Sequence, residues 1–416
     1  MTDTSLRLRA VPAIAEVPAL DWDACANPRL ESVTQVSLEG LAPAAGKFNS
    51  ISQDNAYNPF VSFDFLYCLE ASGSAIARTG WQPQHLLAES QDGTVLGAVP
   101  CYLKSHSRGE YVFDRGWAEA YERAGGRYYP KLQVSVPFTP ATGPRLLVRP
   151  GERADLVRAT LAAGLVELCR QHDASSIHVT FMREPECLFL AERGFLHRTD
   201  QQFHWENAGY GSFDDFLAAL SARKRKTIRR ERRDALAAGI SVHWLTGKDL
   251  TEEVWDAFFD FYMETGSRKW GRPYLTRKFY SLVGERMADQ VLLIMAKRAG
   301  RWIAGAINFI GSDTLFGRHW GAIEHHPFLH FELCYYQAID YAIAHKLKRV
   351  EAGAQGEHKL ARGYLPVTTH SAHYIADPGL RRAVADYLVR ERAYVEAAGE
   401  ELAAAAPFRK DLVEQE

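Results

Sequence analysis

The residues best suited to chemistry lie in a glycine-rich segment near the C-terminus, residues 351–363, which reads EAGAQGEHKLARG. Its glycines let backbone N–H groups approach a ligand, and the short helix expected after them favours an anion at its N-terminus. Acyl transfer to an amine needs a base for the amine proton and donors for the oxyanion. The base would be Glu357 or His358. The groups expected to bind substrate or the oxyanion are Gln355, Gly356, Lys359 and Arg362. A capped turn without a function is the alternative.

A second candidate base precedes this segment in the chain. His319 lies between Arg318 and Trp320 at the end of an expected strand, 314–320. This strand would lie beside the segment 351–363, so we expect His319 to serve as an alternative base. Arg318 and Trp320 would contact the substrate there. Tyr336, on the helix expected over 328–347, is a further candidate for substrate binding.

A run of basic residues lies in the middle of the chain. Eight of the eleven residues from 223 to 233 are Lys or Arg, and one is an acid. Like charges at helical spacing destabilise a helix, so a run this dense favours a polyanionic partner. At helical spacing the candidate phosphate ligands form two faces: Lys226, Arg230 and Arg233 on one, and Arg225, Arg229 and Arg232 on the other. A solvated helix face is the alternative interpretation.

Histidines are concentrated in the C-terminal part, and eight of the fifteen lie between 319 and 373. The sequence contains no His-Glu-x-x-His motif. His370 and His373 are three residues apart on an expected strand and would point to opposite faces. The six cysteines form no Cys-x-x-Cys pair. We therefore expect no metal site.

The overall charge is nearly balanced, with 49 Lys plus Arg against 51 Asp plus Glu and a net charge of −2. A protein that coats nucleic acid over its whole surface would be strongly basic, so we expect no DNA partner. No apolar run has the length of a membrane-spanning helix, and no N-terminal targeting segment is visible. These features favour a cytoplasmic protein with reduced cysteines.

The order of elements is repeated in the two halves of the chain. Each half is expected to contain a hairpin, a strand, a helix, a strand, a short helix and a strand. In the first half, the hairpin strands are 84–89 and 94–103, and the helix is 152–172. In the second half, the strands 291–296, 302–310 and 314–320 precede the helix 328–347. This order predicts an α/β fold of the α+β type, and it resembles the GNAT acyltransferase unit. In such a unit the helical crossover separates two strands, and the acyl donor would lie between them.

Longer motifs extend this resemblance to a family. They read NPF at 58–60, EASGS at 70–74, TGW at 79–81, RHWG at 318–321, FLHFELCYYQ at 328–337, GAQGEHK at 353–359 and THSAH at 369–373. Together they resemble the FemAB-like "peptidoglycan biosynthesis/recognition" family of predicted N-acyltransferases, over residues 50–395.

The resemblance implies two tandem GNAT-like domains, each with a mixed, mostly antiparallel sheet flanked by helices. We expect an N-terminal extension over 1–48 and domains over 49–208 and 209–416, the second opened by the basic helix 213–237. Wider Fem-type relatives transfer amino acids from aminoacyl-tRNA to amines of cell-wall precursors. Typical acetyl-CoA users carry a Gln/Arg-x-x-Gly-x-Gly/Ala turn. Here the turn matches only Arg-x-x-Gly, at 318–321, which favours another donor. The first half has no such turn and resembles a recognition domain.

The sequence therefore predicts an N-acyltransferase that moves an acyl or aminoacyl group to an amine, such as one of a cell-wall precursor. Acyl-CoA or aminoacyl-tRNA would be a co-substrate, and no cofactor would be tightly bound. The alternative is a non-catalytic protein that binds tRNA or a peptidoglycan precursor.

Overall fold

The computed structural model describes residues 5–28, 56–270, 273–353 and 356–409. The mixed α/β fold predicted from the sequence is confirmed. The strands are β1 Arg7–Val11, β2 Trp81–Pro83, β3 His85–Glu89, β4 Val95–Val99, β5 Cys101–Lys104, β6 Lys131–Val134, β7 Leu147–Val148, β8 Ser176–Met182, β9 Leu196–Glu206, β10 Ile240–Leu245, β11 Val291–Arg298, β12 Arg301–Ile310, β13 Thr314–Ala322, β14 Arg349–Glu351 and β15 Leu365–Ile375.

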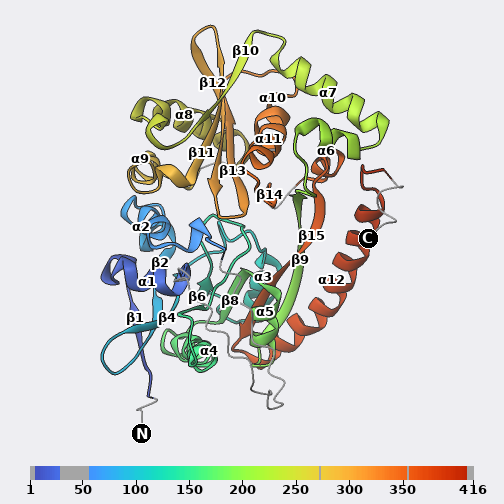
Figure 1. The fold of residues 1–416 in the computed structure, drawn as a ribbon. Helices are drawn as coiled ribbons and strands as arrows, with labels where there is room; N and C mark the ends of the chain where they lie inside the picture. The colour runs from blue at the N-terminus through green and yellow to red at the C-terminus, as the bar shows by residue number, and fades with distance from the viewer. Residues whose placement is uncertain (1–4, 29–55, 271–272, 354–355, 410–416) are drawn as a thin grey trace, which may run out of the picture.

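The helices cover both faces of these strands (Figure 1). They are α1 Ala19–Ala26, α2 Phe63–Ala71, α3 Arg115–Arg123, α4 Ala154–Gln171, α5 Glu184–Ala191, α6 Phe213–Ala219, α7 Ala222–Leu236, α8 Glu252–Trp270, α9 Arg277–Arg286, α10 Leu329–Phe331, α11 Gln337–Ala344 and α12 Pro378–Ala404. A five-residue π-helix, η6 Glu332–Tyr336, joins α10 to α11, and a 3-10 helix, η7 Glu357–Arg362, follows β14. Within the described ranges, no helix combines the length and apolar character needed to cross a bilayer.

A mixed sheet of eleven strands runs through both halves in the order β10-β11-β12-β13-β14-β9-β15-β8-β6-β5-β2. A separate four-stranded sheet has the order β1-β3-β4-β7. The strand expected over 94–103 is in fact two strands, because Pro100 separates β4 from β5 and the two join different sheets. Pro cannot donate a ladder hydrogen bond, which explains the break.

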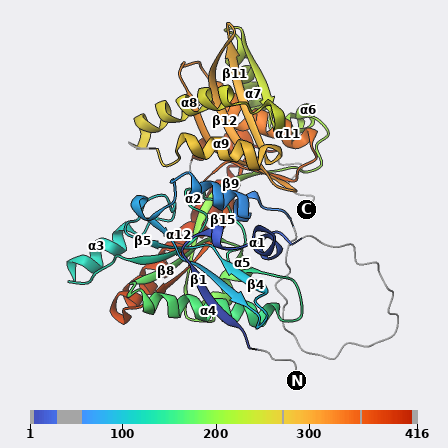
Figure 2. The ribbon, with the colours of Figure 1, turned by 90° about the vertical axis from the view of Figure 1, so that its left-hand side faces the viewer.

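Both halves contain a parallel strand pair joined by a helical crossover, as the repeat predicts. Helix α4 connects β6 to β8 in the first half, and α10, η6 and α11 connect β13 to β14 in the second. Figure 2 shows two lobes: the upper holds β11, β12, α6–α9 and α11, and the lower holds first-half elements such as β4, β8 and α4 together with β15 and α12 of the second half. The domain limits themselves stay a prediction.

The two long strands β9 and β15 connect the halves, because each pairs only with strands of the other half. β9 pairs with β14 and β15, and β15 pairs with β8 and β9. The sheet therefore continues across the expected boundary at residue 208. Helix α12 lies along β9 and β15 (Figure 1).

The second-half strands are buried on both faces. On β11, Leu293 and Met295 belong to the core that includes α8 and α9, whereas Leu292 and Ile294 belong to the core that includes α11. Adjacent strand residues point to opposite faces, so a continuous apolar run such as 291–296 indicates a strand covered on both sides.

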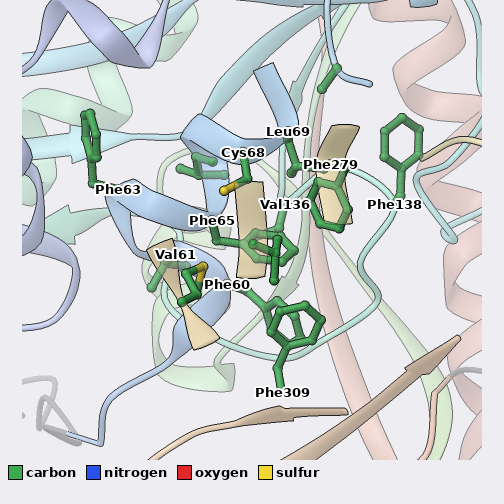
Figure 3. Close-up of a cluster of buried hydrophobic side chains, with 14 of the residues drawn as sticks. Phe60, Val61, Phe63, Phe65, Cys68, Leu69, Val136, Phe138, Phe279 and Phe309 are labelled. Carbon is green, nitrogen blue, oxygen red and sulfur yellow. The ribbon is translucent and has the colours of Figure 1, made fainter. Parts of the chain in front are cut away.

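One core extends from the first half into the second (Figure 3). The ring of Phe60 lies 5.0 Å from that of Phe65, 5.2 Å from that of Phe309 and 5.1 Å from that of Phe316, measured between centroids. Phe60 and Phe65 come from the N-terminal part, and Phe309 and Phe316 lie on β12 and β13. The aromatic contacts therefore join the two halves.

The helix expected over 213–237 is two helices. Helix α6 ends at Ala219, and Leu220 adopts an extended conformation with ψ of 157° and forms a β-bridge with Phe408. Helix α7 starts after Ser221 and carries the basic run. The bridge explains the interruption, because an extended residue cannot continue a helix.

Candidate active site

The site lies where the two parallel strands of the second half separate. β13 and β14 pair over Thr314–Arg349, Leu315–Val350 and Phe316–Glu351, and a cavity of about 150 Å³ follows this last pair. Its lining residues are Tyr262, Thr265, Gly266, Ala306, Ile307, Asn308, Gly317, Arg318, His319, Trp320, His330, Cys334, Tyr335 and Ala352. The cavity has the position that the sequence predicts for an acyl donor.

Three predicted residues, Arg318, His319 and Trp320, line this cavity along β13. Burial and the neighbouring Arg318 lower the pKa of His319 well below its ordinary value. His319 is therefore neutral at physiological pH, which is the form that can accept a proton. Its ring lies 5.1 Å from that of Tyr262 on α8.

Arg318 connects the cavity to the first half of the chain. Its Nη2 donates a hydrogen bond to the carbonyl oxygen of Phe138. Phe138 has a φ of +58°, a conformation that a bulky residue rarely adopts. Its ring is stacked on that of Tyr274 at 4.8 Å. The guanidinium is thus oriented by a loop of the other lobe.

The π-helix η6 forms the opposite wall. Its extra residue per turn brings Cys334 and Tyr335 to the cavity, whereas Tyr336 is fully buried in the core. The Tyr335 hydroxyl is hydrogen-bonded to His358 Nε2 at 2.9 Å. Burial raises the pKa of Tyr335, so this phenol is protonated at neutral pH. His358 is therefore connected to the cavity by its hydrogen bond to Tyr335, which was not among the site residues predicted from the sequence. π-Helical turns are frequent at functional sites.

Other predicted residues are held away from the cavity. Tyr336 and Arg362 both contact Glu231 of α7. Lys359 is buried, its Nζ donates to the carbonyl oxygen of Gly353 at 2.9 Å, and burial lowers its pKa to about 8. Gly356, with φ of +115°, directly precedes η7. Gln355 and the side chain of Glu357 lie outside the described residues.

The basic run divides into an inner and an outer set. Arg232 is half-buried and pairs with Glu332 at 2.9 Å and Asp340 at 2.6 Å. Arg229 pairs with Asp214, and Arg233 with Asp234, at the surface. We define the outer face of α7 by its exposed basic residues, Arg223, Lys226, Arg229, Arg230 and Arg233. Arg225 is half-buried. The two predicted faces are thus not equivalent.

A larger hollow of about 630 Å³ adjoins the cavity and shares Thr265, Trp320 and His330 with it. It lies at the turn between β13 and α10, where acetyl-CoA users would bind a pyrophosphate. Here the turn carries Glu324, which is paired with Arg298 and His326. The hollow is also lined by Arg268, His325 and His330, and its turn departs after Arg-x-x-Gly from the pattern of acetyl-CoA users.

The corresponding place in the first half is filled by protein. Strands β6 and β8 pair as far as Val134 and Val179, and residues 143–145 lie against the next residues of β8. There the Gly143 amide donates to the Phe181 carbonyl, and Arg145 Nε donates to the Thr180 carbonyl at 2.9 Å. Glu186 accepts from the backbone amide of Arg145. Residues 143–145 and Glu186 thus occupy the place beyond this strand pair where the second half has its cavity.

Several residues of the site were missed from the sequence. Tyr262 and Thr265 lie in α8, a region without a recognisable motif, and Asn308 lies within an apolar strand. Glu351 was noted only as the start of the glycine-rich segment. Burial raises its pKa to about 8. In the sequence, the position of Glu351 next to those glycines was the one sign that it lies near the site.

A metal centre receives no support from the geometry. Across the described parts of the chain, no three His, Cys, Asp or Glu residues are grouped in a way that would hold a metal ion. His370 lies beside His197, with 3.1 Å between Nδ1 and Nε2, and His373 lies beside His178. His319, His325, His326, His330 and His358 instead gather around the cavity and the adjoining hollow, apart from His370 and His373.

Comparisons with known proteins agree with the fold. A family model for FemAB-like proteins, described as peptidoglycan biosynthesis/recognition, matches residues 13–410, which confirms the family resemblance. The structure of FemX is 13% identical with a TM-score of 0.50, over 76% of this chain and 93% of that chain. Its likeness shows a shared fold. A tandem GNAT protein from the clavulanic acid pathway is 16% identical with a TM-score of 0.43, over 90% and 99%. L-PGS from Bacillus licheniformis is 10% identical with a TM-score of 0.47, over 77% and 95%. The curated proteins include no match.

Proposed function

Because the chain belongs to the FemAB-like family of peptidoglycan biosynthesis and recognition, we propose that it is an N-acyltransferase acting on an amine of a cell-wall precursor. The observation that carries this proposal is the cavity between the separating strands β13 and β14, with His319 on one wall and Tyr335 on the other. A base and an acid facing one cavity are the groups that acyl transfer to an amine requires.

The proposed reaction begins when the acceptor amine attacks the carbonyl carbon of the donor. Neutral His319 accepts the amine proton as the C–N bond forms. The bond from the carbonyl carbon to the leaving oxygen or sulfur then breaks, and the leaving group takes the Tyr335 hydroxyl proton. His358, which is exposed and bonded to Tyr335, passes a proton from solvent back to Tyr335, and His319 releases the amine proton to solvent, so that both groups return to their starting states. Arg318 supports the oxyanion with its positive charge.

We propose aminoacyl-tRNA as the donor rather than acyl-CoA. Glu324 occupies the turn where a CoA pyrophosphate would need N–H groups and cations. The outer face of α7 supplies exposed positive charge near the cavity, because α7 contacts α10, η6 and η7. The first half, whose corresponding site is filled, would recognise the acceptor. Such donors are made in the cytoplasm, where we expect the protein to act.

The test is a transfer assay with purified protein, a precursor carrying a free amine, and either bulk aminoacyl-tRNA or acyl-CoA. Mass spectrometry of the acceptor shows which acyl group has moved. We expect transfer from aminoacyl-tRNA and a loss of about 10²–10⁴-fold in rate for His319→Gln. His243→Gln changes an exposed histidine on β10 and serves as the matched control. Transfer from acyl-CoA alone would overturn the donor assignment. Precursor binding without turnover from either donor would instead support the non-catalytic alternative.

A further inference from the structure

The one acidic residue in the basic run, Glu231, points into the protein. It is 6% exposed, whereas its neighbour Arg230 is exposed at the surface. Helix α7 contacts η6 and η7, the elements that carry Tyr335 and His358. A single helix therefore presents its basic outer face to solvent and one carboxylate to the wall of the cavity.

Glu231 forms an ion pair with Arg362, in which one guanidinium nitrogen contacts both carboxylate oxygens. Arg362 Nη2 lies 3.0 Å from Oε1 and 2.9 Å from Oε2 of Glu231. The Tyr336 hydroxyl donates to the same carboxylate. Both side chains of the ion pair are 8% exposed, so solvent screens this pair very little.

Arg362 extends the contact to the cavity wall. Its Nη1 donates to the carbonyl oxygen of His358 at 2.7 Å, and its guanidinium carbon lies 3.4 Å from the centroid of the Phe331 ring. Its Nε is buried and has no hydrogen-bond partner among the described residues. Glu231 is thus the charged group that sets the orientation of this guanidinium, and the guanidinium in turn holds the backbone at His358.

We propose that Glu231 is a positioning residue for the reaction: through Arg362 it holds His358, and hence the Tyr335 hydroxyl, in place at the cavity. This inference rests on the proposed function, because it assigns Glu231 a role in that reaction. Glu231 does not touch the cavity, and its effect passes through three side chains. A displacement of about 1 Å at a reacting group can cost about 10²-fold in rate.

The test compares Glu231→Gln and Glu231→Asp with wild type. Glu391→Gln is the matched control, because Glu391 also pairs with one arginine through both carboxylate oxygens, here with Nε and Nη2 of Arg198 at 2.8 and 2.7 Å, but lies on α12. In the transfer assay we expect kcat to fall about 10²-fold in Glu231→Gln, with KM for the donor unchanged. Glu231→Asp keeps the charge but shortens the side chain, and should lose kcat while remaining folded.

Alkylation of Cys334 by iodoacetamide supplies a readout that needs no turnover. Cys334 is half-buried and lines the cavity next to Tyr335, whereas the other five cysteines are buried. Peptide mass spectrometry would therefore measure Cys334 labelling in the folded protein. We expect a several-fold change in this rate for both Glu231 variants and none for Glu391→Gln.

The outcomes separate the two proposals. Wild-type kcat and Cys334 labelling in both Glu231 variants would overturn the positioning role. Equal losses in Glu391→Gln and the Glu231 variants would show a general effect on the fold, which also overturns it. If wild type transfers nothing from either donor, the proposed function fails, and the labelling rates alone decide whether Glu231 sets the geometry of the wall. If Glu231→Gln does not fold, Glu231→Asp decides.

Discussion

Phe316 of β13 and Glu351 of β14 form the last pair before the two parallel strands separate. The carboxyl of Glu351 is therefore buried at the point where the cavity begins, and the side chain is 5% exposed. Its Oε2 has no hydrogen-bond partner within the described part of the chain, and His204 Nε2 lies 4.0 Å away. A buried carboxyl without full compensation favours its neutral form.

This burial predicts a pH-dependent contribution to stability. Burial raises the pKa of Glu351 from 4.5 in the unfolded chain to about 8 in the fold. The folded state then holds a proton that the unfolded state has lost between about pH 4.5 and 8, so stability falls as pH rises through this range. The contribution is fully present below pH 4.5 and is lost as pH rises through about 8, and its size is on the order of 5 kcal/mol.

Glu351→Gln should remove this dependence. The difference in unfolding free energy between the variant and wild type, from urea titrations, should shift in favour of the variant between pH 5 and 8. Glu253→Gln, an exposed acid on α8, is the control and should show no comparable slope. A constant difference between wild type and Glu351→Gln across this range would contradict the prediction.

The position of the cavity was predictable, but one of its walls was not. Tyr336, on the helix expected over 328–347, was a candidate for substrate binding, but the π-helical turn buries it and presents Tyr335 to the cavity instead. A π-turn depends on tertiary contacts and has no simple sequence pattern, so the neighbouring tyrosine was missed.

The pH dependence of transfer should reveal the state of His319. Burial and Arg318 lower its pKa well below 6.5, so the neutral base predominates at neutral pH and protonates only in acid. If His319 is the base, kcat/KM should stay level from pH 7 down through 6.5 and fall in more acidic solution. Arg318→Gln removes one of the two causes and should move this acidic limb to higher pH. An acidic limb centred at or above pH 6.5 in wild type would contradict this assignment.

The aromatic core that joins the halves predicts cooperative unfolding. Phe60→Ala removes a buried ring that contacts Phe309 and Phe316 of the second half, and should cost about 3–5 kcal/mol. Because this ring contacts side chains of both halves, the two halves should unfold together. Unfolding of wild type and of the variant, followed by tryptophan fluorescence and by far-ultraviolet circular dichroism, should each be a single coincident transition. Phe113→Ala, at a site 67% exposed, should cost little and serves as the control. Two separate transitions in wild type would show that the halves unfold independently.

The basic run illustrates what composition can and cannot predict. Its density indicated an anion site, but only the fold distinguishes Arg232, held by Glu332 and Asp340, from the exposed Arg230. The two acids that pair with Arg232, Glu332 and Asp340, lie about one hundred residues further along the chain. Helical spacing within α7 contains no information about them, so the two predicted faces looked alike.

The outer face of α7 should therefore account for any binding of RNA. Changing Lys226, Arg229 and Arg230 to Gln should weaken binding of bulk tRNA at low salt and make the dependence of log Kd on log salt shallower by about two units. The control changes Arg115, Arg382 and Arg390, which are exposed on α3 and α12, to Gln. This control alters the net charge equally but should leave the slope unchanged. Equal effects of the two triple variants would mean that binding follows overall charge, and the outer face would then be a solvated surface.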